Sequence, residues 1–427
     1  MQANTLTLRN AGIPAAALGR RGDGTVGRYD VEIEAGRIAV IGPAGSSTGT
    51  AVRDLEDGLV LPCFTDLHTH LDKGHIWPRT PNPDGSFMGA LLAVAKDREA
   101  RWAAADVRRR MEFALRCAHA HGTAAIRTHL DSVPPQDGIS WDVFDDVRAA
   151  WTGRIELQAV SLVGPDEMLD TALLRRIGAR VKAAGGLLGG AIAAHPHSRQ
   201  AMRNMVDVAG ELGLDLDLHC DESLDPAAQS LRHLAEAVLE SGYGGRVLAG
   251  HCCSIGVQDE ATQRETIARV AEAGIAIVSL PMCNLYLQDR AGSRTPLRRG
   301  VTLLREFRAA GVPVALASDN TRDPFYAYGD LDALEVLREG ARILQFDHPQ
   351  NEAWDWLRTI GSGASEIAGF EHGAAIAIGA PADLVLFRAR NWTELLARPQ
   401  SDRVVLRGGE RIDTTLPDYR ELDEMME

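Results

Sequence analysis

The stretch LGLDLDLHCDE, residues 212–222, shows the unit from which most of this chain is built. Gly213 ends a helical pattern, a short alternating apolar run follows, and the run stops at the polar residues from His219 to Glu222. The same order of helix, glycine, apolar run and polar residues recurs along the sequence. A glycine that caps a helix before a strand, repeated in series, predicts parallel strands joined by crossover helices.

Eight such apolar runs are expected to form strands. They cover residues 59–61, 124–129, 155–160, 190–195, 214–219, 247–251, 275–279 and 312–319. Eight units over about 310 residues fit an α/β fold of the (β/α)8 TIM-like barrel type, and a doubly wound open sheet is the alternative. Polar residues follow nearly every run. This favours the barrel, because many strand ends supply the active site at a barrel's C-terminal face.

Both ends of the sequence have a different character. Residues 29–34 alternate between polar and apolar side chains, and residues 383–387 and 403–407 are short strand candidates separated by turns. Chain termini often lie close together in a domain. We therefore expect a small β-sandwich domain built from residues 1–58 and 370–427, beside a barrel domain over residues 59–369.

Composition excludes several classes of partner. The net charge is −14 over 427 residues, and nucleic acid or an anionic membrane would need clustered Lys and Arg instead. No apolar run approaches the roughly 20 residues that span a bilayer, and the N-terminus has no secretory pattern. The six cysteines include no CxxC pair and fit a reducing compartment. We expect a cytoplasmic protein with no nucleic-acid or membrane partner.

Histidines and carboxylates stand where the expected strands end. His68 and His70 are two residues apart, so in an extended segment both point to one side, as a transition metal requires. His219 ends the fifth strand, and Glu222 lies beyond it, where it could carry protons. Each motif alone also fits a polar turn or an acidic loop.

Two further strand ends extend the pattern. His251 ends the sixth strand, and Asp319 follows the wholly apolar run of the eighth, where a buried carboxylate needs a partner or a metal. Alone, His251 would fit a structural histidine. Imidazoles and carboxylates at the ends of so many strands of one inferred barrel predict a shared metal site.

This order of residues resembles the amidohydrolase superfamily, and within it the bacterial cytosine deaminase-like branch. The matching stretches are HTHLDK (68–73), RTHLD (127–131), HCDE (219–222), NLYLQDR (284–290) and SDNTRDPFY (318–326). The resemblance covers about residues 55–370, and the strands at both ends fit the small composite domain of that family. It implies a homo-oligomer.

The resemblance also implies a ligand set. His68, His70, His219 and Asp319 would hold one divalent metal ion, which is zinc, iron or manganese in family members. Relatives with two metals use a lysine at the end of strand four. The corresponding residues 189–195 contain no lysine, which favours one metal.

The implied reaction is the hydrolytic deamination of a small neutral N-heterocycle, a cytosine-like cyclic amidine. A metal lowers the pKa of water, Asp319 accepts a proton, His251 bonds the water and the intermediate, and Glu222 protonates the ring nitrogen beside the attacked carbon. Ammonia then leaves. The matching stretches add Asn284 and Phe325 as expected substrate contacts.

Two other histidines end strands. His195 ends strand four and His129 ends strand two, so each could line the pocket or support the ligands from behind. We include His195 among the expected substrate contacts.

The substrate remains open among several rings. Cytosine deaminases of this branch carry a glutamine just after strand three, where this sequence has Val163-Gly164. A related cyclic amidine is therefore as consistent as cytosine. Two alternatives are an amidohydrolase that releases an alkylamine from an aminotriazine-like ring and one that opens a cyclic amide. A third, of another class, is a non-catalytic scaffold that keeps the barrel.

Overall fold

The computed structural model describes residues 5–20, 24–348 and 350–427 and shows an α/β fold. The chain divides into two compact units. The first consists of Met1–Thr65, Arg116–Ala125 and Asp332–Pro417, and the second of Asp66–Leu115, Ile126–Leu331 and Asp418–Glu427.

The second unit carries the repeated strands that the sequence predicts. A three-stranded sheet has the order β6-β7-β8, and a five-stranded sheet has the order β13-β12-β11-β10-β9. All neighbours in the five-stranded sheet run parallel, as expected for helix–strand repeats. The bounds are β6 (Phe64–Thr69), β7 (Thr123–Asp131), β8 (Glu156–Leu162), β9 (Ala191–Ile192), β10 (Leu216–Cys220), β11 (Val247–His251), β12 (Ala276–Ser279) and β13 (Val314–Leu316).

Isolated parallel bridges also link these strands. Thr69 at the end of β6 pairs with Asp319 beyond β13, and Val160 of β8 pairs with Leu187 before β9. The order of the strands therefore follows the order of the chain from β6 to β13.

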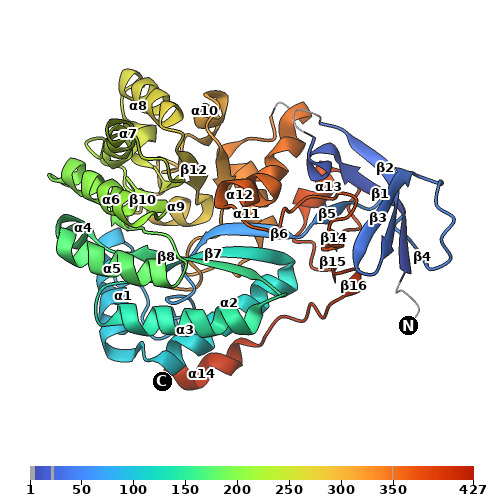
Figure 1. The fold of residues 1–427 in the computed structure, drawn as a ribbon, viewed down its shortest axis with the longest axis horizontal. Coiled ribbons are helices and arrows are strands. Elements are labelled where there is room, and N and C mark those ends of the chain that lie inside the picture. The colour runs from blue at the N-terminus through green and yellow to red at the C-terminus, as the bar shows by residue number, and fades with distance from the viewer. Residues whose placement is uncertain (1–4, 21–23, 349) are drawn as a thin grey trace. The chain divides into compact units, whose positions relative to one another are not determined.

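Helices alternate with the strands and flank them (Figure 1). Glycines end two of these helices: the C-cap of α6 is Gly213 and that of α7 is Gly242. Both residues have a left-handed backbone, which glycine adopts readily. The bounds are α1 (Phe87–Arg101), α2 (Ala104–His121), α3 (Gln136–Trp151), α4 (Pro165–Leu169), α5 (Thr171–Ala183), α6 (Ser198–Leu212), α7 (Ser230–Ser241), η2 (Ser254–Val257), α8 (Glu260–Glu272), α9 (Pro281–Leu287), α10 (Leu304–Ala309), η4 (Tyr419–Leu422) and α14 (Asp423–Met426).

The first expected strand forms, but it lies in a different sheet from the one predicted. Residues 59–61 largely form β5 (Val60–Pro62), which pairs antiparallel with β14 in the first unit. The strand that carries the His-x-His motif is β6, which begins only at Phe64. A continuous apolar run fits any strand that is buried on both faces, so the pattern alone could not assign the sheet.

The first unit contains two four-stranded sheets of the orders β3-β2-β1-β4 and β16-β15-β14-β5. Strands from both ends of the chain thus belong to one unit. The bounds are β1 (Thr5–Pro14), β2 (Val26–Glu34), β3 (Arg37–Pro43), β4 (Val52–Asp54), β14 (Leu384–Leu386), β15 (Val404–Arg407), β16 (Glu410–Arg411), η1 (Ala15–Leu18), α11 (Ala333–Leu344), η3 (Gln350–Ile360), α12 (Ser362–Ala368) and α13 (Trp392–Ala397).

None of the helices in the described part of the chain combines the length and the apolar character that crossing a membrane requires. All six cysteines are buried free thiols.

Candidate active site

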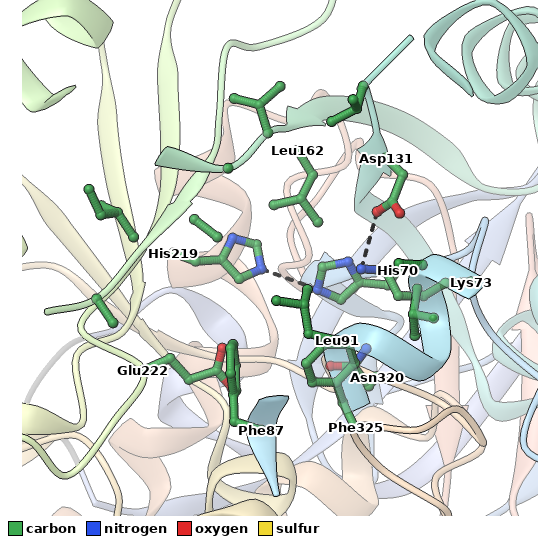
Figure 2. Close-up of a pocket in the computed structure, with 18 of the residues that line it drawn as sticks. His70, Lys73, Phe87, Leu91, Asp131, Leu162, His219, Glu222, Asn320 and Phe325 are labelled. Atoms are coloured by element: carbon green, nitrogen blue, oxygen red, sulfur yellow. Dashed lines mark hydrogen bonds and ion pairs between the residues drawn. The ribbon is translucent and has the colours of Figure 1, made fainter. Parts of the chain in front are cut away.

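Three histidines converge at the C-terminal ends of two strands. His68 lies on β6 and His219 on β10, while His70 directly follows β6. The Nε2 atom of His219 lies 3.1 Å from that of His68 and 3.2 Å from that of His70. Figure 2 shows the imidazoles of His70 and His219 turned toward each other. All three side chains are buried.

Asp319 brings a carboxylate to the same point. Its Oδ1 lies 3.2 Å from Nε2 of His70 and 3.8 Å from Nε2 of His68. Burial raises the pKa of this carboxyl to about 7 in the absence of a bound cation. Its backbone has a φ of +67°, which costs a non-glycine residue energy and persists only where surrounding contacts hold it. One such contact is the bond from the Asp319 amide to the backbone oxygen of His68 at 2.9 Å.

The donor set fits a divalent metal ion. Burial lowers the pKa of His68, His70 and His219 well below the usual value, so each ring is neutral and has a free lone pair. Neutral imidazole nitrogens that face one another at this distance can coordinate one cation through their lone pairs. Three imidazoles and one carboxylate are typical ligands of zinc, iron and manganese. The four expected ligands are therefore together.

A second group of side chains adjoins the first. Glu222 follows β10 and His251 ends β11, and the Oε1 of Glu222 lies 3.3 Å from Nδ1 of His251. The side-chain nitrogen of Asn284, on α9, lies 2.9 Å from the same Nδ1 and 3.4 Å from Oε1 of Glu222. Burial, with the nearby charge of Asp319, raises the pKa of Glu222 well above its usual value. A carboxyl of this kind can hold a proton at neutral pH and release it to a bound ring.

His129 is a site residue whose role the sequence left open. It lies on β7, is fully buried, and its ring centroid is 4.1 Å from that of His68 and 4.6 Å from that of His219. One nitrogen of each of these three rings falls within 4.8 Å of the others. His129 thus packs directly against two of the expected ligands and is not among the residues that line the cavity. Its place at a strand end was the signal that singled it out.

A cavity of about 380 Å³ opens beside these groups. His70, His219, Glu222 and Asp319 line one part of it, and the rest is mostly apolar, with Phe87 and Leu91 of α1 among its walls. Apolar cavities with a few converging polar groups are typical of small-molecule sites.

Lys73, Asp131 and Arg98 form an ionic cluster in the cavity wall. The Nζ of Lys73 lies 3.3 Å from Oδ1 of Asp131 (Figure 2). Arg98 of α1 donates to Oδ2 of Asp131 at 2.7 Å. Two cations thus share one carboxylate at this wall.

The expected substrate contacts differ in their positions. Phe325 lines the cavity, and its ring meets that of Phe87 edge to face at a centroid distance of 5.5 Å. Asn284 contacts Glu222 and His251 as described above. His195 is not among the residues lining the cavity, although its neighbours Ala191 and Ile192 are, and its Nδ1 accepts a bond from the backbone of His197.

The chain is similar to known amidohydrolases over nearly its whole length. The model of the Amidohydrolase family matches residues 147–415. A pterin deaminase of Rhizobium rhizogenes is 54% identical, over 98% of this chain and 96% of the relative. N-isopropylammelide isopropyl amidohydrolase of a Pseudomonas species is 23% identical, over 84% of this chain and 87% of the relative.

A solved structure supports the same relationship. The 5-methylcytosine deaminase of Klebsiella pneumoniae, liganded with 5-fluorocytosine, superposes with a TM-score of 0.80 at 25% identity, covering 96% of this chain and 98% of that one. The predicted superfamily and the predicted enzyme class, a hydrolytic deaminase, are thereby confirmed. Members of this superfamily depend on metal, in keeping with the histidine cluster. The chain belongs to the amidohydrolase family.

Proposed function

We propose that this enzyme hydrolytically deaminates a pterin, the 2-amino-4-oxo derivative of the bicyclic pteridine ring. The observation that carries the proposal is the 54% identity to a pterin deaminase over 98% of the chain. In a pterin the carbon that bears the amino group lies between two ring nitrogens. This is the cyclic amidine that the sequence motifs predict as the reacting group.

The proposed reaction adds water to that carbon and expels ammonia. The oxygen of water forms a bond to the carbon, the bond from the carbon to the amino nitrogen breaks, and a carbonyl remains. A divalent metal held by His68, His70, His219 and Asp319 would supply the Lewis acid that lowers the pKa of water.

The side chains of the enzyme move the protons. Asp319 accepts the proton that water loses, since its carboxylate lies at the edge of the imidazole cluster. Glu222, whose pKa burial raises well above its usual value, donates a proton to the ring nitrogen and makes the carbon electrophilic. His251 hydrogen-bonds the attacking water and the tetrahedral intermediate. Asn284, within 3.4 Å of both partners, orients His251 and Glu222.

The cavity suits a flat ring of this size. A volume of about 380 Å³ exceeds what a single pyrimidine fills, and Phe87 and Phe325 offer aromatic surface to a planar ligand. The cavity wall includes Val163 and Gly164 where cytosine deaminases carry a glutamine. This exchange of an amide for small residues favours a ring other than cytosine.

The alternative within the family is the release of an alkylamine from an aminotriazine-like ring. It is favoured by the likeness to N-isopropylammelide isopropylaminohydrolase of Burkholderia multivorans, with a TM-score of 0.74 at 26% identity. The lower identity places it second to the pterin.

The test is ammonia release by metal-loaded enzyme from pterin, cytosine, 5-methylcytosine and isocytosine, with isopropylamine release from N-isopropylammelide measured in parallel. Ammonia from pterin, at a kcat/KM at least tenfold above that for the pyrimidines, supports the proposal. Preference for a pyrimidine or release of isopropylamine would overturn it. Isocytosine carries the same amino-oxo edge as pterin without the second ring. The ratio of kcat/KM for pterin to kcat/KM for isocytosine therefore measures what binding of the second ring contributes.

We also infer that the two sheets of the second unit form one closed (β/α)8 barrel. The parallel bridges at Thr69–Asp319 and Val160–Leu187 support this closure. The β-sandwich of the two four-stranded sheets, the domain division at residues 59–369, and assembly as a homo-oligomer remain predictions.

A further inference from the structure

The segment Asp418–Glu427 belongs to the second compact unit, whereas the residues just before it, Asp332–Pro417, belong to the first. It forms η4 and α14 and buries Leu422. Nothing in the proposed reaction uses this segment, so its contacts with the rest of the unit call for another role.

Tyr419 of this segment contacts both ends of one loop. Its hydroxyl donates to Oδ1 of Asp330 at 3.0 Å, and the guanidinium carbon of Arg322 lies 3.8 Å from its ring centroid. The ring also packs against Phe113 of α2, at a centroid distance of 5.5 Å. A cation over an aromatic face and a hydrogen bond to a carboxylate are both directional contacts. A single side chain therefore ties residue 322 to residue 330.

The loop that it ties, residues 319–331, carries part of the active site. It starts at the proposed ligand Asp319, and Phe325 in its middle lines the cavity. Inside the loop, Oδ1 of Asp323 accepts the backbone N–H groups of Phe325 at 2.9 Å and Tyr326 at 3.1 Å. The position of the Phe325 ring thus depends on the shape of the whole loop.

The loop is strained near the points that Tyr419 contacts. Arg322 has a φ of +49° and Leu331 a φ of +56°, both in the left-handed region that non-glycine residues avoid. Such residues keep their conformation only where neighbouring contacts restrain them. Tyr419 supplies contacts to Arg322 itself and to Asp330, the neighbour of Leu331.

The metal end of the loop has separate support. The amide of Asp319 bonds to the backbone oxygen of His68, and the amide of Ser318 donates to Oδ1 of Asp66 at 3.1 Å. Neither bond involves Tyr419. Loosening the loop at 322 and 330 should therefore displace Phe325 and leave the proposed metal ligands in place.

We propose that Tyr419 is a positioning residue that, from outside the cavity, holds the loop 319–331 in the shape that binds the substrate ring. The inference rests on the proposed function for the identity of that ring. Tyr419 touches neither the cavity nor the ligands, so its effect passes through Arg322, Asp330 and the loop to Phe325.

The test compares three variants of the metal-loaded, full-length enzyme. Tyr419→Ala should raise the KM for pterin about tenfold, the order of one lost aromatic contact, and leave kcat within about twofold. Tyr419→Phe keeps the ring over Arg322 and loses the bond to Asp330, so its KM should lie between that of the wild type and that of Tyr419→Ala. Arg420→Ala is the matched control, because its side chain is exposed and pairs with Asp418 of its own turn. Since Tyr419 is 41% exposed, truncation creates no buried cavity that would threaten the fold.

A second readout does not depend on the substrate. Amide hydrogen exchange at Asp323, Phe325 and Tyr326 should become faster in Tyr419→Ala than in the wild type and in Arg420→Ala. Unchanged exchange and unchanged KM in Tyr419→Ala would overturn the inference. So would a joint loss of bound metal, Tm and kcat, which would indicate a general structural role. Faster exchange in an enzyme that does not act on pterin would refute the proposed substrate and support the positioning role.

Discussion

Replacing Glu222 with glutamine removes one proton from the active site and almost nothing else. Glutamine has the shape of glutamate, so the contacts of residue 222 with His251 at 3.3 Å and Asn284 at 3.4 Å are retained in geometry. An amide cannot give a proton to a ring nitrogen. The variant therefore isolates proton transfer from binding.

The size of the loss follows from this role. General acid catalysis by a positioned side chain contributes about 100- to 10,000-fold, which corresponds to about 3–5 kcal/mol of transition-state stabilisation. We expect kcat to fall by that factor while KM stays within about twofold, because the lost interaction acts in the transition state alone.

Stability should not fall with activity. Burial raises the pKa of Glu222 in the folded state above its unfolded value of about 4.5. The protonated carboxyl is compatible with the fold below the unfolded pKa of about 4.5. As pH rises above that pKa the fold loses stability, because the buried Glu222 must either keep its proton or carry a buried charge. Glutamine removes this cost, so the Tm at pH 7 should equal or exceed that of the wild type.

The assay is steady-state ammonia release with metal content determined on the same samples. Glu211→Gln is the control, since Glu211 is an exposed glutamate that pairs with Arg175 on the surface. A Glu222→Gln enzyme that binds metal fully and keeps more than a tenth of the wild-type kcat would refute the assignment of Glu222 as the proton donor.

Three further predictions test the metal centre and the first unit. Removing metal with a chelator should abolish ammonia release and lower the Tm, and adding zinc or manganese should restore both, because a cation that binds the folded state alone stabilises it; a Tm that metal does not change would contradict the ligand set. His129→Ala should weaken metal binding about 10- to 100-fold by removing the ring that packs on His68, as measured by competition with a chromophoric chelator. Asp332→Asn should lower the stability of the first unit by about 3–5 kcal/mol, because Arg403 donates two bonds to the Asp332 carboxylate, and a neutral amide leaves its buried charge unpaired. Burial raises the pKa of Asp332, but Arg403 outweighs it and lowers that pKa, so the stabilisation is present at neutral pH and is lost as pH falls below about 4; thermal melts of both proteins between pH 3 and 7 should therefore converge at the acid end.

The local signals in the sequence were sufficient for most of the fold. Gly213 marks a helix end because glycine adopts the left-handed backbone conformation without the steric energy that a side chain would add. The apolar run after it fits a buried strand or a buried helix. Such signals depend on a few neighbouring residues, so they can be interpreted without the structure of the rest of the chain. They failed at residues 59–61, where an apolar run fits either sheet and the choice depends on partner strands far along the chain.

The sequence by itself determined which residue types stand at the strand ends, and the motifs at His68, His219 and Asp319 were enough to identify the superfamily. Only the tertiary structure decided their spacing, because His68 and His219 meet at 3.1 Å across 151 positions of chain. It also decided that His129 packs against His68 and that Tyr419 contacts Arg322 and Asp330. These are contacts between distant segments, and their energies depend on the packing of the whole unit and not on the local pattern of residues.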